Sequence, residues 1–450
     1  MLMQACRVKS LLFVLLYLLS FVVLSEIEIA NLHQVYYVNG GEMKVSFQLI
    51  AHVKTYSGYV SWAMRLNDLN VEEVSAKGRD VNVSIERTAD EITFLFDPFL
   101  SNGESVRVFL TVDMPLSWKG GVGNVDLFPI FQASETDLSF VYNPNDFIVT
   151  PKRFSNFYVK DNEIIYKGEG IFRVVPNVES NHMLIEELWV KIRGSCSSLT
   201  IRDPYFCTSV SGLPLSWKAG KWNALGMKES YDSSGAEFLT ITRLRSDEVL
   251  RHSIEVVLQP RLDTRMITLD WDEFTPPANL KRFGRNKCHI DELERLSETL
   301  RDESAGPYEY ILRIIDWLQG EFRYDKRVSR ERSDVKRCIE SLRERRGVCE
   351  DYAILFNYMV RSQGIPALAV IGYAGDDMGE HAWNLVWLGR WTFVDPTWAL
   401  VGGVGLKHIP TLLSPDFDHW FDEKTLTCSW WYRYSGDAVA ELTHEIKVEW

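Results

Sequence analysis

The stretch RRGVCEDYAILFNYMVRSQGIPALAVIGY (345–373) combines a helical pattern with one cysteine at the point where the helix should begin. Cys349 falls in the first turn, and the apolar pattern continues to about Gln363. Gly364 and Pro366 are typical of the residues that follow a helix. The run of β-branched and small apolar residues after them predicts a strand, so the stretch reads as a loop, a helix and a strand.

A thiol at a helix start loses its proton more readily than an ordinary thiol. The first N–H groups of the helix have no intrahelical acceptor, and the macrodipole favours an anion there. Glu350 and Asp351 follow Cys349 directly and oppose this effect by like-charge repulsion. The helix start alone therefore does not decide whether Cys349 is a packed core residue or a nucleophile.

Two further segments supply the partners that a nucleophilic thiol needs. His381 opens HAWNLVW 32 residues after Cys349, and Asp395 lies in WTFVDPTW 14 residues after His381. Both segments read as strands, and one hairpin connection would place His381 and Asp395 side by side. A thiolate attacks a carbonyl, an imidazole accepts and returns a proton, and a carboxylate fixes the imidazole tautomer, so the residue types fit nucleophilic catalysis.

These segments, together with the upstream FRYD, closely resemble the core of the transglutaminase-like superfamily of prokaryotic or archaeal type, which has a papain-like fold. The resemblance covers about residues 290–398. It implies that Cys349 is the nucleophile, His381 the base and Asp395 the orienting acid of an acyl transferase or cysteine peptidase. Such a triad needs no cofactor and no metal ion, and none is expected here.

Two aromatic residues are candidates for supporting roles. The phenol of Tyr324 in FRYD could stabilise the oxyanion together with the backbone N–H of Cys349, and its alternative is plain packing. Trp383, beside His381, could form a wall of the site. Leu385 departs from the family pattern, because many relatives carry an acidic residue at this place. The other aromatic and titratable residues of the region are expected to be structural or core residues: Trp387, Trp391, Trp398, His408, His419 and Cys428.

The remaining cysteines give little sign of a metal site. No CxxC pair occurs in the sequence, which makes a structural zinc site improbable. Cys196 and Cys207 could form a disulfide between neighbouring strands in an oxidising compartment, but spacing does not determine the pairing.

The N-terminus reads as a targeting segment. Arg7 and Lys9 precede an apolar run over 11–24, and Glu26 and Glu28 follow it. Fourteen residues are short for a membrane span and suit the core of a signal peptide, although a poor cleavage site leaves an uncleaved anchor open. In both cases the following residues should lie outside the cytoplasm, in a secreted or surface-anchored protein.

The periodicity predicts an α+β protein with several domains. Short alternating runs with turn residues between them predict two β-sandwich-like domains, over 26–150 and 151–265. After residue 260 the period changes to that of helices, and helices followed by strands predict a transglutaminase-like domain over 266–430. Residues 1–25 are the hydrophobic segment, and 431–450 a final strand segment.

The net charge of −13 argues against nucleic-acid binding. We expect an exported or membrane-anchored cysteine enzyme that forms a thioester with a protein or peptide substrate. Water as acceptor would make it a protease or deamidase, and an amine acceptor would make it a transglutaminase. The alternative is a non-catalytic surface protein whose β-domains bind partners, and a trapped acyl-enzyme would distinguish the two.

Overall fold

The computed structural model describes most of the chain after the N-terminal segment. The described residues are 27–39, 42–53, 61–65, 82–87, 91–97, 105–114, 117–127, 135–193, 196–203, 205–206, 210–223, 227–231, 237–241, 248–260, 262–286, 289–328, 333–415, 431–436 and 439–449. The predicted targeting segment lies outside these ranges. Of the helices within them, none has the length and apolar character needed to span a membrane.

The chain divides into two compact units, which interleave along the sequence. Unit 1 comprises Met1–Leu116, Asp126–Tyr142 and Ser155–Gly170, and unit 2 comprises Ser117–Val125, Asn143–Phe154 and Ile171–Trp450. Unit 2 thus contains the catalytic candidates together with most of the second β-rich region. The domain boundaries expected from the sequence stay predictions.

Unit 1 is built from strands. Its six-stranded sheet has the order β11-β12-β9-β1-β2-β6, with β1 and β9 parallel. The bounds are β1 (Ile27–Asn39), β2 (Glu42–Val53), β6 (Ser105–Met114), β9 (Glu135–Tyr142), β11 (Phe157–Lys160) and β12 (Glu163–Lys167). A second sheet, β3-β5-β4, contains β3 (Ser61–Arg65), β4 (Asn82–Arg87) and β5 (Glu91–Asp97). Leu32, Tyr36 and Val38 of β1 are buried and Tyr37 is exposed, in the expected alternation. The β-rich character is confirmed, and the sandwich packing stays a prediction.

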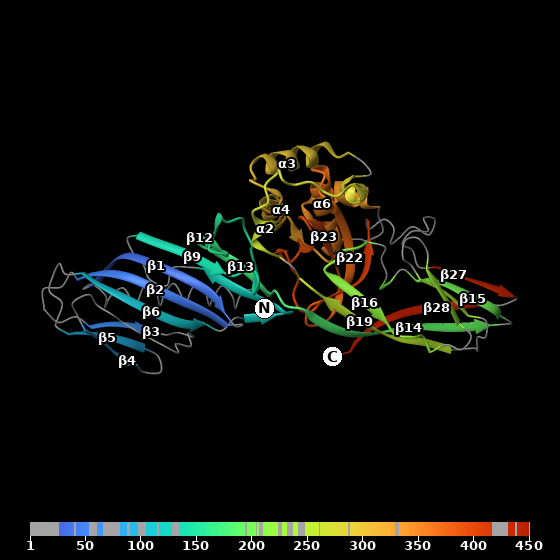
Figure 1. Cartoon of the computed structure of the whole chain (residues 1–450), viewed down its shortest axis with the longest axis horizontal. Coiled ribbons are helices and arrows are strands. Elements are labelled where there is room, and N and C mark those ends of the chain that lie inside the picture. Colours follow the sequence, from blue (N-terminus) through green and yellow to red (C-terminus); the bar gives the residue numbers. More distant parts are fainter. Residues whose placement is uncertain are drawn as a thin grey trace. The chain divides into compact units, whose positions relative to one another are not determined.

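Three four-stranded sheets, drawn mostly from unit 2, have the orders β10-β13-β8-β7, β16-β19-β14-β28 and β17-β18-β15-β27. Their bounds are β7 (Ser117–Lys119), β8 (Val122–Leu127), β10 (Phe147–Pro151), β13 (Gly170–Pro176), β14 (Ser180–Arg193), β15 (Cys196–Asp203), β16 (Leu215–Ala219), β17 (Met227–Tyr231), β18 (Glu237–Ile241), β19 (Glu248–Leu258), β27 (Trp431–Gly436) and β28 (Val439–Glu449). The last two strands pair with β15 and β14, so the chain leaves these sheets after β19 and returns to them at its end. The segment between β19 and β27 is therefore an insertion in the topology of the two sheets (Figure 1).

This inserted segment is the α+β domain that the periodicity predicts. Its helices are α2 (Thr264–Ile267), η1 (Ala278–Gly284), α3 (Asp291–Asp302), α4 (Pro307–Glu321), α5 (Asp334–Glu344) and α6 (Cys349–Ser362). The antiparallel sheet β25-β24-β23-β22-β26 contains β22 (Ala367–Ala374), β23 (Gly379–Trp387), β24 (Trp391–Asp395), β25 (Leu400–Val401) and β26 (His408–Ser414). A short parallel pair, β20 (Arg323–Tyr324) with β21 (Arg346–Gly347), leads into α6.

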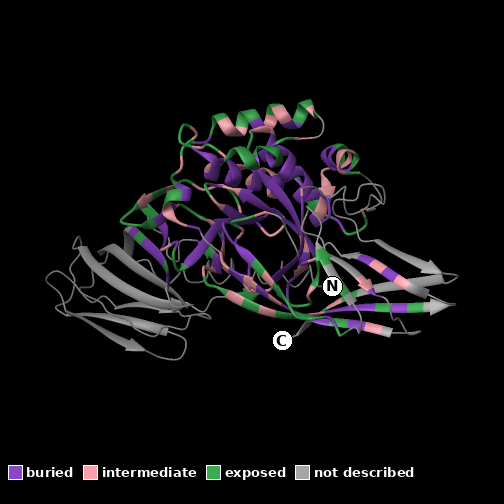
Figure 2. Ribbon diagram, turned by 45° about the vertical axis from the view of Figure 1, so that its right-hand side comes forward, coloured by how far each residue is buried: buried purple, intermediate pink, exposed green. Residues whose placement is uncertain are grey.

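The sheet of this domain is packed on both faces. On one face α6 is attached by Asn384, whose amide donates to the Ala353 carbonyl at 3.0 Å and to Asn357 Oδ1 at 2.8 Å. On the other face Leu385 joins a buried apolar cluster that includes Ile254 of β19. Figure 2 shows that the sheet and α6 are buried along most of their length. Helix and sheet are thus held rigidly with respect to each other, which fixes any site that draws on both.

Candidate active site

Cys349 begins α6, in the position that the sequence predicts. Val348 is the N-cap residue, and its N–H donates to Asp351 Oδ2 at 2.7 Å. The thiol is buried, and it is not engaged in a disulfide. As the first residue of the helix, Cys349 has a backbone N–H without an intrahelical acceptor. This N–H is available to a negative charge that develops next to the sulfur.

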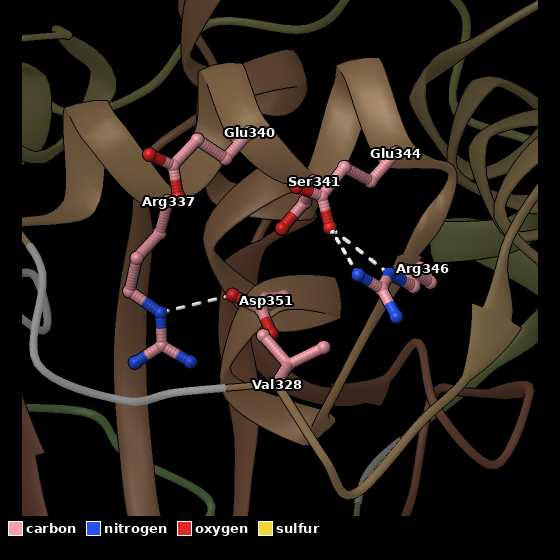
Figure 3. Close-up of a pocket in the computed structure, with 7 residues that line it drawn as sticks. All are labelled: Val328, Arg337, Glu340, Ser341, Glu344, Arg346 and Asp351. Atoms are coloured by element: carbon pink, nitrogen blue, oxygen red, sulfur yellow. Dashed lines mark hydrogen bonds and ion pairs between the residues drawn. The ribbon is translucent and has the colours of Figure 1, made fainter.

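The acidic residues that follow Cys349 are neutralised by an arginine that the sequence argument overlooked. Arg337 of α5 is buried, and its Nε donates to Asp351 Oδ1 at 2.9 Å (Figure 3). Its second nitrogen, Nη1, pairs with Glu350. Burial by itself lowers the pKa of Arg337, but the bonds and charges of Asp351 and Glu350 raise it above the ordinary value. Arg337 therefore offsets the repulsion that is expected between these carboxylates and a thiolate.

The same arginine lines a small cavity behind the start of α6 (Figure 3). The residues around this cavity carry charges of both signs, and they are Val328, Arg337, Glu340, Ser341, Glu344, Arg346 and Asp351. Arg346 donates to Glu344 at 2.9 Å on the far side of the cavity. The arginines that line the cavity are thus paired with carboxylates, and the lining carries charges of both signs rather than a uniform charge for a ligand.

The structure brings His381 and Asp395 together at adjacent strands. Nε2 of His381, in β23, lies 2.8 Å from Oδ2 of Asp395 at the end of β24, and both side chains are buried. Cys349 lies near enough to the His381 ring to contribute to the upward shift of its pKa. Because Nε2 faces the carboxylate, Nδ1 is the ring nitrogen that remains for the sulfur. Thiol, imidazole and carboxylate therefore stand in one chain of contacts.

The electrostatics of this chain favour a charged imidazole. Burial by itself lowers the pKa of His381, but the charge and hydrogen bond of Asp395, with a smaller contribution from Cys349, raise it to about 10. For Asp395 burial acts to raise the pKa, and His381 and His408 hold it far below its usual range. At neutral pH His381 is therefore an imidazolium that lies between the Asp395 carboxylate and the Cys349 side chain.

Asp395 has a second imidazole partner, His408, which the sequence argument took to be structural. His408 begins β26 and is fully buried, and its Nε2 lies 3.1 Å from the same Oδ2 atom. The other carboxylate oxygen, Oδ1, accepts the backbone N–H groups of Thr397 at 2.9 Å and Trp398 at 3.1 Å. No motif surrounds His408, so only the pairing of β26 with β22 reveals its place at the site.

His381, Asp395 and His408 could also hold a metal ion, because one ligand atom of each lies within 4.8 Å of the others. A metal at this place would displace the two hydrogen bonds that the imidazoles make to Asp395. It would also occupy the ring nitrogen that orients His381 toward Cys349. The geometry therefore suits a hydrogen-bonded network at least as well as a metal centre.

Two tryptophans surround the histidines. Trp383 stacks on His381 with 5.7 Å between ring centres, and it is fully buried behind the ring. Trp398 lies 5.7 Å from His381 and meets His408 edge-on at 4.6 Å. Trp398 is partly exposed, so it is the better candidate for a wall that a substrate touches. The sequence predicts Trp383 for that role and Trp398 as a core residue.

The hairpin of β7 and β8, from the sequence range predicted as the first β-domain, lies against Trp398. The tip between β7 and β8 carries Gly120, whose N–H donates to Asp376 Oδ2 at 3.1 Å. A Cβ atom built on Gly120 would lie 3.0 Å from the indole of Trp398. Lys407 completes the contact by donating to the other oxygen of Asp376 at 2.7 Å. A segment far from the catalytic motifs in sequence thus borders the site.

Tyr324 lies beside the chain that enters α6. It is the β20 partner of Gly347, two residues before Cys349, and its ring centre is 6.4 Å from that of Tyr352. The side chain is 41% exposed, so its hydroxyl is accessible to a substrate as well as to water. The position is compatible with an oxyanion donor, and the role stays a prediction.

Comparison with known proteins identifies the family of this domain. The sequence model of the transglutaminase-like superfamily matches residues 294–396, which include Cys349, His381 and Asp395. Kyphoscoliosis peptidase of Homo sapiens is 32% identical over 150 residues, which are 31% of this chain and 22% of the relative. Uncharacterized protein ML0607 of Mycobacterium leprae (strain TN) is 36% identical over 69 residues, 13% of this chain and 25% of the relative. The chain spans about a quarter or less of the length of the curated relatives it matches.

Solved structures show more distant similarity. A candidate cysteine protease from Cytophaga hutchinsonii has a TM-score of 0.38 at 19% identity, covering 60% of this chain and 92% of that chain. The periplasmic domain of TgpA from Pseudomonas aeruginosa has a TM-score of 0.28 at 16% identity, covering 56% of this chain and 88% of that chain. These low scores add nothing to the family assignment, which rests on the sequence match. Residues 294–396 of this chain are a transglutaminase-like domain.

Proposed function

We propose that the protein is a cysteine enzyme that forms a thioester on Cys349 with the carbonyl of a protein or peptide substrate. The observation that carries this proposal is the chain of contacts from Cys349 through His381 to Asp395. A buried thiol at a helix start, next to an imidazole that a carboxylate keeps charged, has the properties of an activated nucleophile.

In the first half of the reaction the Cys349 thiolate attacks the carbonyl carbon of a carboxamide or peptide bond. A C–S bond forms, and the carbonyl electron pair moves to oxygen. When that pair returns, the C–N bond breaks and the His381 imidazolium gives its proton to the leaving nitrogen. The products are a thioester on Cys349, a neutral His381 and a free amine or ammonia.

In the second half His381 accepts a proton from the incoming nucleophile, which attacks the thioester carbon. The C–S bond breaks, the thiolate returns, and the imidazolium is restored. Water as nucleophile gives hydrolysis, and a primary amine gives transamidation. We propose a peptide or protein as acyl donor and leave both acceptors as outcomes of the experiment below.

The oxyanion of both halves is held by the backbone N–H of Cys349 and the phenol of Tyr324. The N–H is fixed by the helix start, and Tyr324 lies on the strand that pairs with the residues leading into it. Donors that are positioned before the reaction stabilise developing charge without reorganisation.

The experiment compares two buried cysteines of the same domain that form no disulfide, Cys349 and Cys338. The full chain is incubated with a peptide library, with and without a primary alkylamine, and acid-quenched for mass spectrometry. We expect an acyl adduct on Cys349, absent from Cys349→Ser and retained in Cys338→Ser, and turnover that follows the same pattern. No adduct on Cys349 and equal iodoacetamide reactivity of both cysteines would favour the non-catalytic surface protein.

We also propose that the domain acts outside the cytoplasm, secreted or held by the N-terminal segment. The support is the charge pattern around residues 11–24. Protease added to intact cells should cut the β-rich regions. Protection in intact cells with cleavage after lysis would contradict export, without bearing on the catalytic proposal.

A further inference from the structure

We propose that His408 is a positioning residue of this site, which holds the Asp395 carboxylate and moderates its attraction for the His381 proton. The inference rests on the proposed function, since it adds a fourth side chain to the same reaction. It begins from the observation that one oxygen atom of Asp395 receives two imidazoles, at 2.8 Å from His381 and 3.1 Å from His408.

The surroundings of His408 fix its protonation state. Its ring is fully buried between Trp398, 4.6 Å away, and Trp383, 5.6 Å away, both met edge-on. Burial lowers its pKa, Asp395 acts to raise it, and the nearby His381 lowers it further, so that the net direction is down. Next to it in sequence, Lys407 is paired with Asp376. His408 is thus the neutral imidazole, and its Nε2–H donates to the carboxylate.

The two imidazoles therefore have different tasks. His381 carries the proton that moves in catalysis, and His408 supplies a donor that stays in place. A hydrogen bond given to a carboxylate stabilises its charge and makes it a weaker partner for a second proton. With His408 present, Asp395 holds the imidazolium of His381 strongly enough to maintain the thiolate, yet less strongly than a carboxylate without this donor would. The proton of His381 remains transferable to a leaving group.

The backbone donors on the other oxygen support the same view. Thr397 and Trp398 bind Oδ1, so with the two imidazoles the carboxylate has a donor in each of four directions. A carboxylate with this many donors cannot rotate without losing one of them. Removing His408 would leave Oδ2 to His381 alone.

The test uses the pH dependence of iodoacetamide labelling at Cys349, which needs no identified substrate. In a thiolate–imidazolium pair this curve has two steps, and the upper step reports the loss of the imidazole proton. In His408→Phe, which keeps a flat ring but lacks the donor, we expect the upper step to rise by roughly one pH unit. His408→Gln retains an N–H donor of similar reach and should lie near the wild type.

A matched control separates positioning from general destabilisation. His252 is another buried imidazole, 2.7 Å from the buried carboxylate of Glu186, outside the site. His252→Phe should lower the melting temperature as His408→Phe does, and should leave the labelling curve unchanged. An upper step that is unmoved or lowered in a folded His408→Phe protein would overturn the inference while leaving the labelling of Cys349 itself intact.

If His408→Phe fails to fold, the wild-type protein gives a second test. Nitrogen chemical shifts of the histidine rings should show His408 neutral, with its proton on Nε2, from mildly acidic to alkaline pH. A His408 ring that is protonated at neutral pH would contradict the proposal. Slow labelling of Cys349 at every pH would instead contradict the proposed function.

Discussion

Two buried carboxylates of unit 2, Glu186 and Asp395, each lie next to a histidine ring. The two pairs differ in which group lies near the rest of the ring. Glu186 binds Nε2 of His252 at 2.7 Å, and the His252 ring lies flat on Trp222 with 3.8 Å between centres. Its Nδ1 faces the carbonyl of Gly220 at 3.3 Å. In the site, Asp395 likewise binds Nε2 of its histidine.

In the candidate site Nε2 of His381 is occupied by Asp395, and the neighbour that acts on the rest of the ring is the Cys349 thiol rather than a carbonyl. A carbonyl has no proton to give and no role as a nucleophile, whereas a thiol can exchange its proton with the ring. A buried histidine–carboxylate pair is therefore not itself a sign of catalysis. What distinguishes the His381–Asp395 pair from the His252–Glu186 pair is the group on the other side of the histidine ring.

The largest expected effect is the change in the labelling rate of Cys349 when His381, but not His252, is replaced by alanine. His381→Ala removes the cation next to the sulfur, so it should slow iodoacetamide labelling of Cys349 at pH 6 by roughly 100-fold or more. His252→Ala should leave that rate unchanged, because its pair does not reach the thiol. Stopped-flow or quenched labelling with mass spectrometry measures both rates, and equal slowing in the two variants would erase the distinction.

The next effect concerns the oxyanion. Tyr324→Phe removes one hydroxyl donor beside the start of α6. Because Tyr324 is 41% exposed, the hydrogen bond from its hydroxyl to the oxyanion competes with hydrogen bonds to water. We therefore expect kcat to fall about tenfold, at the lower end of the effect of one oxyanion donor. Tyr158→Phe, at a similarly exposed tyrosine of unit 1, is the control. Turnover that is equal in the two variants would assign Tyr324 to packing.

The charged pair of the site should also appear in the pH dependence of stability. The pKa of His381 is raised to about 10 in the folded protein. Its contribution to the free energy of unfolding is therefore complete below the pKa of an unfolded histidine, near 6.5, and is lost as pH rises toward 10. The pKa of Asp395 is lowered in the folded protein. Its contribution to the free energy of unfolding is therefore present above the pKa of an unfolded aspartate, about 3.9, and is lost in acid. Urea midpoints of the wild type and His381→Phe should therefore converge between pH 6.5 and 10. A constant difference would mean that His381 is not held charged by the fold.

The smallest expected effect lies at the hairpin that borders Trp398. Gly120 has φ +61°, and an added Cβ would press on the Trp398 indole. Gly212 has φ +72° and open space around the same position. Both Gly120→Ala and Gly212→Ala should cost about 1 kcal/mol of folding free energy through the backbone. Gly120→Ala alone should shift Trp398 and slow Cys349 labelling a few-fold, whereas equal labelling rates would exclude a role for the hairpin in the site.

The sequence was most informative where local signals are strong. The start of α6 at Cys349, the stop after it and the strands that carry His381 and Asp395 all follow from periodicity and from residues with fixed positional preferences. The antiparallel sheet of the domain was predicted for the same reason. These features depend on residues close in sequence, so a single chain displays them.

The features that were missed depend on contacts that leave no local pattern. Arg337 reaches Asp351 from another helix, and His408 reaches Asp395 across a loop, yet each looks like an ordinary residue in its own segment. The contact of Gly120 with Asp376 joins segments more than 250 residues apart. Other expectations fall on residues that the structure does not describe: the segment over 1–25, Cys207, Cys428 and His419. For these the predictions stand as made.

The pairing of β28 with β14 has a consequence for how the protein is made. Leu188 of β14 is opposite His444, roughly 250 residues later, with the whole transglutaminase-like domain between them. At about 5–20 residues per second, a ribosome would leave this edge of β14 without its partner for on the order of ten to fifty seconds. During that time β14 presents free backbone groups to other chains. Synthesis of β28 thus covers this edge of β14, and deletion of residues 431–450 should cause aggregation in cells more readily than loss of any motif at the candidate active site.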